Sequence, residues 1–122
     1  MFNKIKFSYR EADNQNNTFT PNHTRFKCKI KYCGLQYTFD YQCNTAYSEP
    51  NMRDCIYAAT CDMFTYDNCR DIADFIAEYG YDDIKAASRA YKGCKKTSIA
   101  LHRLFTDDEL DELMEELTEM GC

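Results

Sequence analysis

The stretch from residue 25 to residue 43 alternates apolar and polar side chains, and it constrains the fold more than any other feature. Apolar residues occupy the even positions from Phe26 to Tyr32 and the odd positions from Leu35 to Cys43. A period of two is typical of half-buried strands. Cys33-Gly34 separates the two runs as a two-residue turn, in which glycine can take a positive φ. Pairing Tyr32 with Leu35 sets every apolar residue opposite another, so the sequence predicts an antiparallel hairpin in this register.

A second alternation covers residues 4–10, where Ile5, Phe7 and Tyr9 share one face. It predicts a first strand that pairs beside the hairpin. Residues 11–24 are rich in asparagine and are expected to form a polar loop.

After residue 48 the apolar period becomes helical, with steps of three and four. We expect helices over residues 50–63, from about Asp67 to Tyr79, over about 82–105, and from Thr106 onward. Thr106 and Glu109 have the spacing of a capping box. The residues expected to face inward are Met52, Ile56, Ala59 and Met63 on the first helix, Cys69, Ile72, Ala73 and Ile76 on the second, Ile84, Ala87, Tyr91, Cys94, Ser98, Leu101 and Phe105 on the third, and Leu110, Leu113 and Leu117 with Met114 and Met120 on the last.

These elements predict an α+β fold in which a three-stranded antiparallel sheet packs against about four helices on one face. The 122 residues fit a single domain, 1–122, with the sheet in residues 1–45 and the helical part in residues 48–122. No stretch approaches the roughly 20 apolar residues of a membrane span, and no secretory signal is recognisable, so we expect a cytoplasmic protein.

Charge is sorted along the chain rather than mixed. Residues 84–105 hold six basic residues and no acid, whereas residues 107–119 hold eight acids and no base. The net charge of −5 therefore describes neither part. Such polarity predicts charged partners and says little about a reaction.

Acidic helical faces are the first candidate binding surface, for a basic groove of a protein partner. The candidate residues are Asp67, Asp71, Asp74 and Glu78 on the second helix and Asp108, Asp111, Glu112, Glu115 and Glu116 on the last. Carboxylate rows of this kind can imitate the phosphates of DNA. A simpler reading is that any amphipathic helix turns polar residues outward.

Basic faces are the alternative, for nucleic acid. The candidate residues are Lys27, Lys29 and Lys31 on the outer face of the sheet and Lys85, Arg89, Lys92 and Lys96 on the third helix. Affinity for phosphates would depend on salt. The aromatic side chains alternate onto the buried face, which argues against base stacking.

Eight cysteines are present without a single CxxC pair, and only two histidines accompany them. This spacing argues against zinc and favours reduced, buried thiols. Acid windows lack the turn glycine of an EF-hand, so neither a metal nor a cofactor is expected. No familiar catalytic motif occurs, and although a Cys–His pair stays open, we expect no enzyme.

Several short motifs recur in a known type of small protein: Tyr66-Asp67-Asn68-Cys69-Arg70, Phe75 with Tyr79-Gly80-Tyr81-Asp82, and Ala90-Tyr91-Lys92-Gly93-Cys94-Lys95-Lys96 before Leu104-Phe105. With these motifs the stretch from Arg53 to Phe105 resembles proteins carried by phages and prophages. The resemblance implies a mobile-element origin and an accessory role in the host bacterial cytoplasm, such as blocking host defence. Small acidic inhibitors such as anti-CRISPR proteins fit that role.

Three functional hypotheses follow. The first is a non-catalytic inhibitor of a bacterial anti-phage nuclease complex that acts through the acidic helical faces. The second is a nucleic-acid-binding accessory protein that acts through the basic faces. The third is a purely structural or assembly protein, and the oligomeric state stays open.

Overall fold

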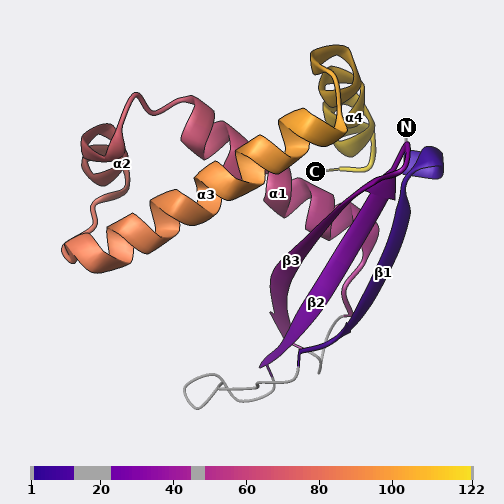
Figure 1. The fold of residues 1–122 in the computed structure, drawn as a ribbon, viewed down its shortest axis with the longest axis horizontal. Helices are drawn as coiled ribbons and strands as arrows, with labels where there is room; N and C mark the ends of the chain where they lie inside the picture. The colour runs from indigo at the N-terminus through magenta and orange to yellow at the C-terminus, as the bar shows by residue number, and fades with distance from the viewer. Residues whose placement is uncertain (1, 13–22, 45–48, 122) are drawn as a thin grey trace.

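Three strands are followed by four helices in the computed structural model, which describes residues 2–12, 23–44 and 49–121 (Figure 1). The polar loop expected over residues 11–24 lies mostly outside these ranges. The elements are a 3-10 turn η1 (Phe2–Lys4), the strands β1 (Lys6–Glu11), β2 (His23–Tyr32) and β3 (Leu35–Asn44), and the helices α1 (Met52–Asp67), α2 (Ile72–Tyr79), α3 (Ile84–Leu104) and α4 (Asp107–Glu119). The predicted α+β class is therefore confirmed.

The sheet is antiparallel in the order β1-β2-β3, and the predicted hairpin register is confirmed. Tyr32 pairs with Leu35, and the pairing continues residue by residue to His23 and Asn44. β1 pairs with β2 as expected, from Lys6 opposite Lys31 to Glu11 opposite Phe26. This register sends Phe26, Cys28, Ile30 and Tyr32 of the central strand into the core.

The turn between β2 and β3 requires a left-handed backbone at both of its residues. Cys33 has φ 51° and Gly34 has φ 80°. Two successive positive φ values are those of a type I′ turn, whose twist matches the strands that flank it. The sequence indicated this conformation for Gly34 only, since cysteine has no special preference for it.

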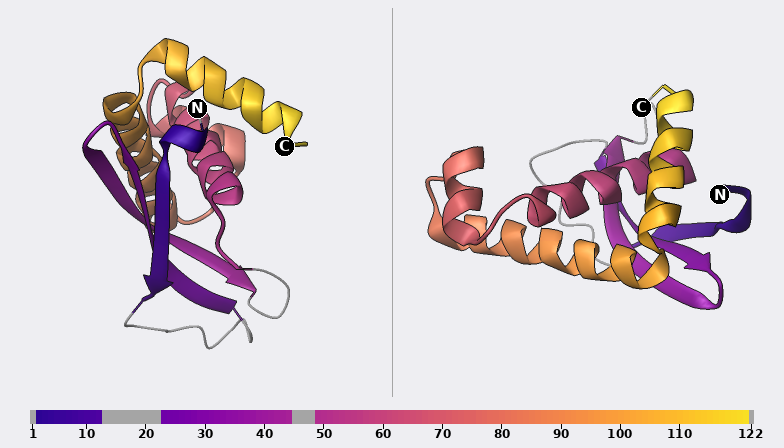
Figure 2. Two further views of the ribbon diagram at one scale, coloured as in Figure 1. Left: turned by 90° about the vertical axis from the view of Figure 1, so that its right-hand side faces the viewer. Right: turned by 90° about the horizontal axis from the view of Figure 1, so that it is seen from above.

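The main core lies between the inner face of the sheet and three helices. Ile30 of β2, Ile56 and Met63 of α1, and Leu101 of α3 are each at most 2% exposed. α4 adds Leu110, Leu113 and Leu117 to the same cluster. α1 and α3 run side by side in opposite directions and continue beyond the sheet (Figures 1 and 2).

α2 lies at the far end of α1 and α3 rather than on the sheet, so the prediction that all four helices cover one sheet face is wrong for α2 (Figure 1). Its inward residue is Phe75, which is 2% exposed and has its ring near Tyr79, Tyr81 and Tyr91. The predicted inward Ala73 is exposed. The short helix α2 is therefore held by the aromatic contacts of Phe75 rather than by packing on the sheet.

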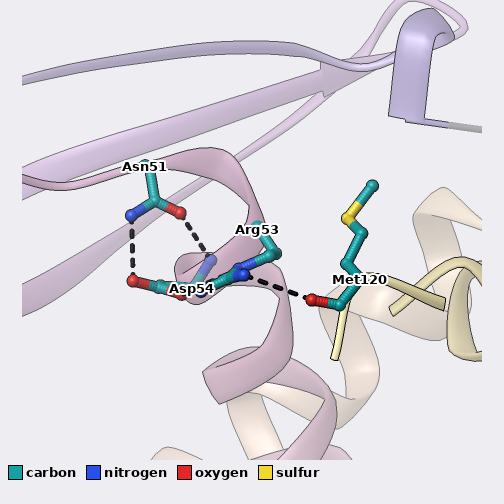
Figure 3. A network of polar contacts seen from close by, with 4 residues as sticks. All are labelled: Asn51, Arg53, Asp54 and Met120. Atoms are coloured by element: carbon teal, nitrogen blue, oxygen red, sulfur yellow. Dashed lines mark hydrogen bonds and ion pairs between the residues drawn. The ribbon is translucent and has the colours of Figure 1, made fainter. Parts of the chain in front are cut away.

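α4 begins with the predicted capping box, in which the Thr106 and Glu109 side chains each accept from the other's backbone amide. Its far end reaches the start of α1. Figure 3 shows Asn51 capping α1 through the Asp54 amide at 2.8 Å, while Arg53 donates to the Met120 carbonyl at 3.4 Å. An arginine on the last carbonyls of a helix satisfies acceptors that have no partner within it.

Besides Ala73, four larger residues predicted to face inward are substantially exposed: Tyr9, Leu35, Ile84 and Met120, with exposed fractions of 42%, 41%, 72% and 45%. Tyr9 lies on an edge strand, Leu35 follows the hairpin turn, Ile84 begins α3, and Met120 caps α4. Each lies at the edge of the sheet or the end of an element. There the periodicity of the sequence places the side chain on the inner face, but no other described element packs over it.

Replacing Gly34 by Ala should destabilise the protein by about 1–2 kcal/mol, because an L side chain is strained at this left-handed position. Gly93 within α3 provides the matched control, since its added Cβ would meet nothing within 4 Å. Gly93→Ala should stabilise by about 0.5–1 kcal/mol through helix propensity. Urea unfolding of both variants measures the two effects, and a neutral Gly34→Ala would contradict the turn assignment.

Candidate functional site

The outer face of the sheet, opposite the helices, gathers most of the positive charge of the strands. Successive side chains of a strand point to opposite faces, so a residue whose sequence neighbours point into the core points to the outer face. The outward cations are Lys6, Arg10, Arg25, Lys27, Lys29 and Lys31, and the one outward acid of the described strands is Asp40. We call these six cations the basic sheet face.

Cross-strand pairing sets like charges of the basic sheet face directly opposite one another. Lys6 lies opposite Lys31, and Arg10 lies opposite Lys27. Like charges at such positions destabilise a sheet. Asp40 relieves one pair, with its carboxylate 2.6 Å from the Lys27 ammonium. Stability alone would favour mixed signs here, so the arrangement points to a negatively charged partner.

A hollow of about 320 Å³ lies on this face, lined by Ser8, Tyr9, Arg10, Lys27, Lys29 and Thr38. Lys29 occupies its centre, because Ser8 and Thr38 are its partners across the two neighbouring strands. An ammonium flanked by two hydroxyl groups offers donors that phosphate oxygens accept. The hollow therefore has the chemistry of a phosphate contact.

Tyr9 follows the predicted alternation, since it pairs with buried Cys28 and its ring lies 5.6 Å from the ring of buried Phe26 on the inner side of the sheet. It is 42% exposed at the edge strand and contributes to the lining of the hollow. Its hydroxyl donates to the Glu49 carboxylate at 3.3 Å, and that negative charge raises the pKa of Tyr9. The exposed Tyr9 ring therefore lies at the edge of the sheet and forms no stacking platform on the outer face.

The predicted basic residues of α3 are all exposed, as expected of Lys85, Arg89, Lys92 and Lys96. The beginning of α3 nevertheless lies beside α2, at the end of the molecule away from the sheet (Figure 1). Lys85 and Arg89, in the first turns of α3, are therefore not joined to Lys27, Lys29 and Lys31 in one surface. Lys96 is closer to the sheet, because the hydroxyl of the next residue, Thr97, lies 3.1 Å from the Tyr37 hydroxyl of β3.

The predicted acidic stripe of Asp67, Asp71, Asp74 and Glu78 is wrong as a single helical face. α1 continues to Asp67, four residues beyond the predicted end, and α2 starts only at Ile72. Asp71 is the N-cap of α2 and accepts from the Asp74 amide at 3.0 Å. Asp74 pairs with Arg70 at 2.9 Å, and the guanidinium lowers the pKa of the Asp74 carboxyl. Two of the four acids thus serve the local structure.

Acids of α4 remain at the surface. Asp108, Asp111, Glu112 and Glu115 are exposed. Glu116 is partly buried and accepts from the Phe2 amide at 3.1 Å, so it fastens the N-terminal segment. Glu109 accepts from the Tyr32 hydroxyl, which ties α4 to the inner side of the sheet. The acidic surface of α4 and the basic sheet face are therefore separated by the sheet.

Asp67 connects α1 to α3 through a pair of contacts that the sequence did not predict. One carboxylate oxygen accepts from the Ser98 hydroxyl at 2.6 Å, and the other lies 2.8 Å from the His102 Nε2 atom. A nucleophile triad needs the imidazole between the hydroxyl and the carboxylate. Here the carboxylate lies between them, which favours a structural role. Ser98 and His102, four residues apart on a helix, were the available signal.

Cysteines divide by location, which corrects the expectation that they are generally buried. Cys28, Cys43 and Cys55 are buried, whereas Cys33 and Cys61 are exposed, and Cys122 lies outside the described residues. The Cys55 thiol donates to Cys28 across 3.9 Å, which lowers the pKa of Cys28 and raises that of Cys55. Among residues 2–12, 23–44 and 49–121 no cluster of three ligand side chains suited to a metal occurs.

Thiol reactivity should follow this division. At pH 8, iodoacetamide should modify exposed Cys33 and Cys61 first, and Cys94 about tenfold or more slowly, because burial raises the pKa of the Cys94 thiol to about 11. Cys28 and Cys55, each 0% exposed, should react only after unfolding. Peptide mass spectrometry of timed samples measures each rate. Rapid native labelling of Cys28 would contradict the packing between β2 and α1.

Comparison with protein-family models, curated proteins and solved structures found no match. The resemblance to phage and prophage proteins therefore stays a prediction. None of the described helices combines the length and the apolar character that crossing a membrane requires.

Proposed function

We propose that this protein binds the phosphate backbone of nucleic acid through the basic sheet face. The observation that carries the proposal is the strand register, which places six cations on one face of the sheet, three of them (Arg10, Lys27 and Lys29) in the lining of a hollow. Lysine and arginine side chains of this kind neutralise phosphates and release counterions. The proposal is the nucleic-acid alternative raised by the sequence, restricted to the sheet.

Binding of this kind is independent of base sequence. The rings of Phe26, Tyr32 and Tyr37 lie in the core, so they cannot stack on bases. The described helices lie on the inner side of the sheet or beyond it, and the donors on the outer face are lysine and arginine side chains. Contacts to phosphates position a protein on nucleic acid without reading its sequence.

The net charge of −5 does not oppose this function. Of the described elements, α4 carries the largest group of exposed acids, and it packs on the inner side of the sheet through Tyr32. Charges farther apart than about 8 Å are largely screened at physiological ionic strength. A polyanion at the outer face therefore responds mainly to the lysines and arginines beside it.

Reversing two charges of the central strand should weaken binding. In Lys29→Glu/Lys31→Glu we expect about tenfold lower affinity for a fluorescent DNA of mixed sequence at low salt, and a salt slope reduced by about 1–2. The fold should persist, because Lys31→Glu replaces a like-charge pair with Lys6 by an opposite-charge pair. Fluorescence anisotropy across a salt series measures both quantities.

Lys85→Glu/Arg89→Glu is the matched control, with the same change in net charge on the part of α3 away from the sheet. It should keep its affinity within about threefold. Equal losses in the two variants would mean that net charge alone controls binding, and absence of binding by the unchanged protein would overturn the proposal.

A second candidate function is inhibition of a bacterial anti-phage nuclease complex. The observation that favours it is the row of exposed acids on α4, which offers carboxylates to a basic groove. The loss of the predicted stripe on α2 moves this hypothesis to α4 and Asp67. The two candidates use different surfaces, so charge reversal on α4 and on the sheet separates them.

A further inference from the structure

A small apolar groove opens where α1, α3 and α4 meet. Its cavity measures about 150 Å³ and is lined by Met63, Phe64, Asp67, His102, Asp107, Leu110, Asp111 and Met114. Met63 and Leu110 are buried, Met114 is half-buried, and Phe64 is 41% exposed. An exposed phenylalanine at the opening of an apolar hollow marks surface that a partner can cover.

Carboxylates surround this apolar surface. Asp107, Leu110, Asp111 and Met114 follow the spacing of one helical face, so acidic and apolar residues alternate along the side of α4 that lines the groove. Asp67 contributes the third carboxylate from α1. Its oxygens are held in place by Ser98 and His102 at 2.6 Å and 2.8 Å.

Two helix ends reach the groove, and their dipoles oppose one another: the negative C-terminal end of α1 at Asp67 and the positive N-terminal end of α4 at Asp107. The attraction for a cation therefore comes from the side-chain carboxylates, and Asp67 is the last residue of α1. An acid at this position is unfavourable for the helix itself. The carboxylates of Asp67 and Asp111 make the electrostatic potential at the groove more negative.

We propose that this groove binds an arginine side chain of a protein partner. The apolar stem lies on Met114 and Phe64, and the guanidinium reaches the carboxylates of Asp67 and Asp111. Arginine fits better than lysine because its planar head pairs with carboxylates in a fork and stacks on an aromatic ring. The cavity is smaller than the roughly 300–1,000 Å³ of typical small-molecule sites, which favours a single side chain.

The proposal goes beyond nucleic-acid binding, because it concerns a different surface and a different class of partner. The remaining exposed acids of α4 are Asp108, Glu112, Glu115 and Glu119. Their charge would accelerate association with a basic protein segment. Failure of DNA binding at the sheet would leave this inference unaffected.

The test uses the full chain and the peptide acetyl-Gly-Arg-Gly-amide, with its citrulline counterpart as the neutral probe of the same shape. In methyl NMR spectra of the protein labelled at methionine, the Met114 resonance should shift and saturate with the arginine peptide. The citrulline peptide should bind at least about fivefold more weakly, because it lacks the charge that the carboxylates attract. Equal binding of the two peptides, or no shift at Met114, would overturn the proposal.

Asp111→Asn and Asp108→Asn form a matched pair on the same helix, with the same change of charge. Asp111 lines the groove, whereas Asp108 is exposed outside the lining. We expect Asp111→Asn to weaken the arginine peptide about fivefold and Asp108→Asn less than about twofold. Equal losses would show general attraction to α4 and would refute a specific groove.

Phe64→Ala tests the apolar part separately, without changing charge. Loss of the ring should weaken the arginine peptide while the Asp111→Asn and Asp108→Asn contrast persists. Thermal unfolding of each variant verifies that the fold remains. Unchanged affinity in a folded Phe64→Ala protein would contradict the proposed placement of the stem.

Discussion

The pairing of β2 with β3 is the interaction on which both the core and the candidate nucleic-acid surface depend. Because side chains alternate along a strand, one register sends Cys28 and Ile30 inward and Lys27, Lys29 and Lys31 outward. A shift by one residue would exchange the two sets. The left-handed turn at Cys33 and Gly34 holds this register at its closed end, and stability and charge display therefore have the same origin.

Packing of the helices explains why opposite charges remain apart. α4 meets the inner side of the sheet through Glu109 and Tyr32, while Phe2 at the other end of the chain binds Glu116. These contacts involve Glu109 and Glu116, the acids of α4 that face the rest of the protein. The acids on the outward side of α4 remain at the surface, on the other side of the sheet from the outward lysines of β2.

Local sequence patterns were sufficient to predict the hairpin, the strand order and the capping box. The capping box depends only on residues three apart, and the strand pairing depends on apolar positions that match between neighbouring runs. Such patterns were insufficient at the junction of α1 and α2. The run from Phe64 to Asp71 contains no proline or glycine, and its one stop signal is Asn68, the C-cap of α1, so tertiary contacts also contribute to the boundary. Ser98 and His102 hold Asp67 at the end of α1, and Asp71 then caps the next helix.

This boundary also decides which acids can act together. On a single helix Asp67 would join Asp71 and Asp74, as the spacing predicted. On α1 it lies instead beside Asp107 and Asp111, where the chain turns from α3 into α4. Asp67 thus belongs to the groove rather than to a stripe, and its contacts with Ser98 and His102 serve both the packing of α1 on α3 and the fixed position of a carboxylate at the surface. The sequence pattern could not predict this role of Asp67, because the residues around it come from three helices that are brought together only by folding.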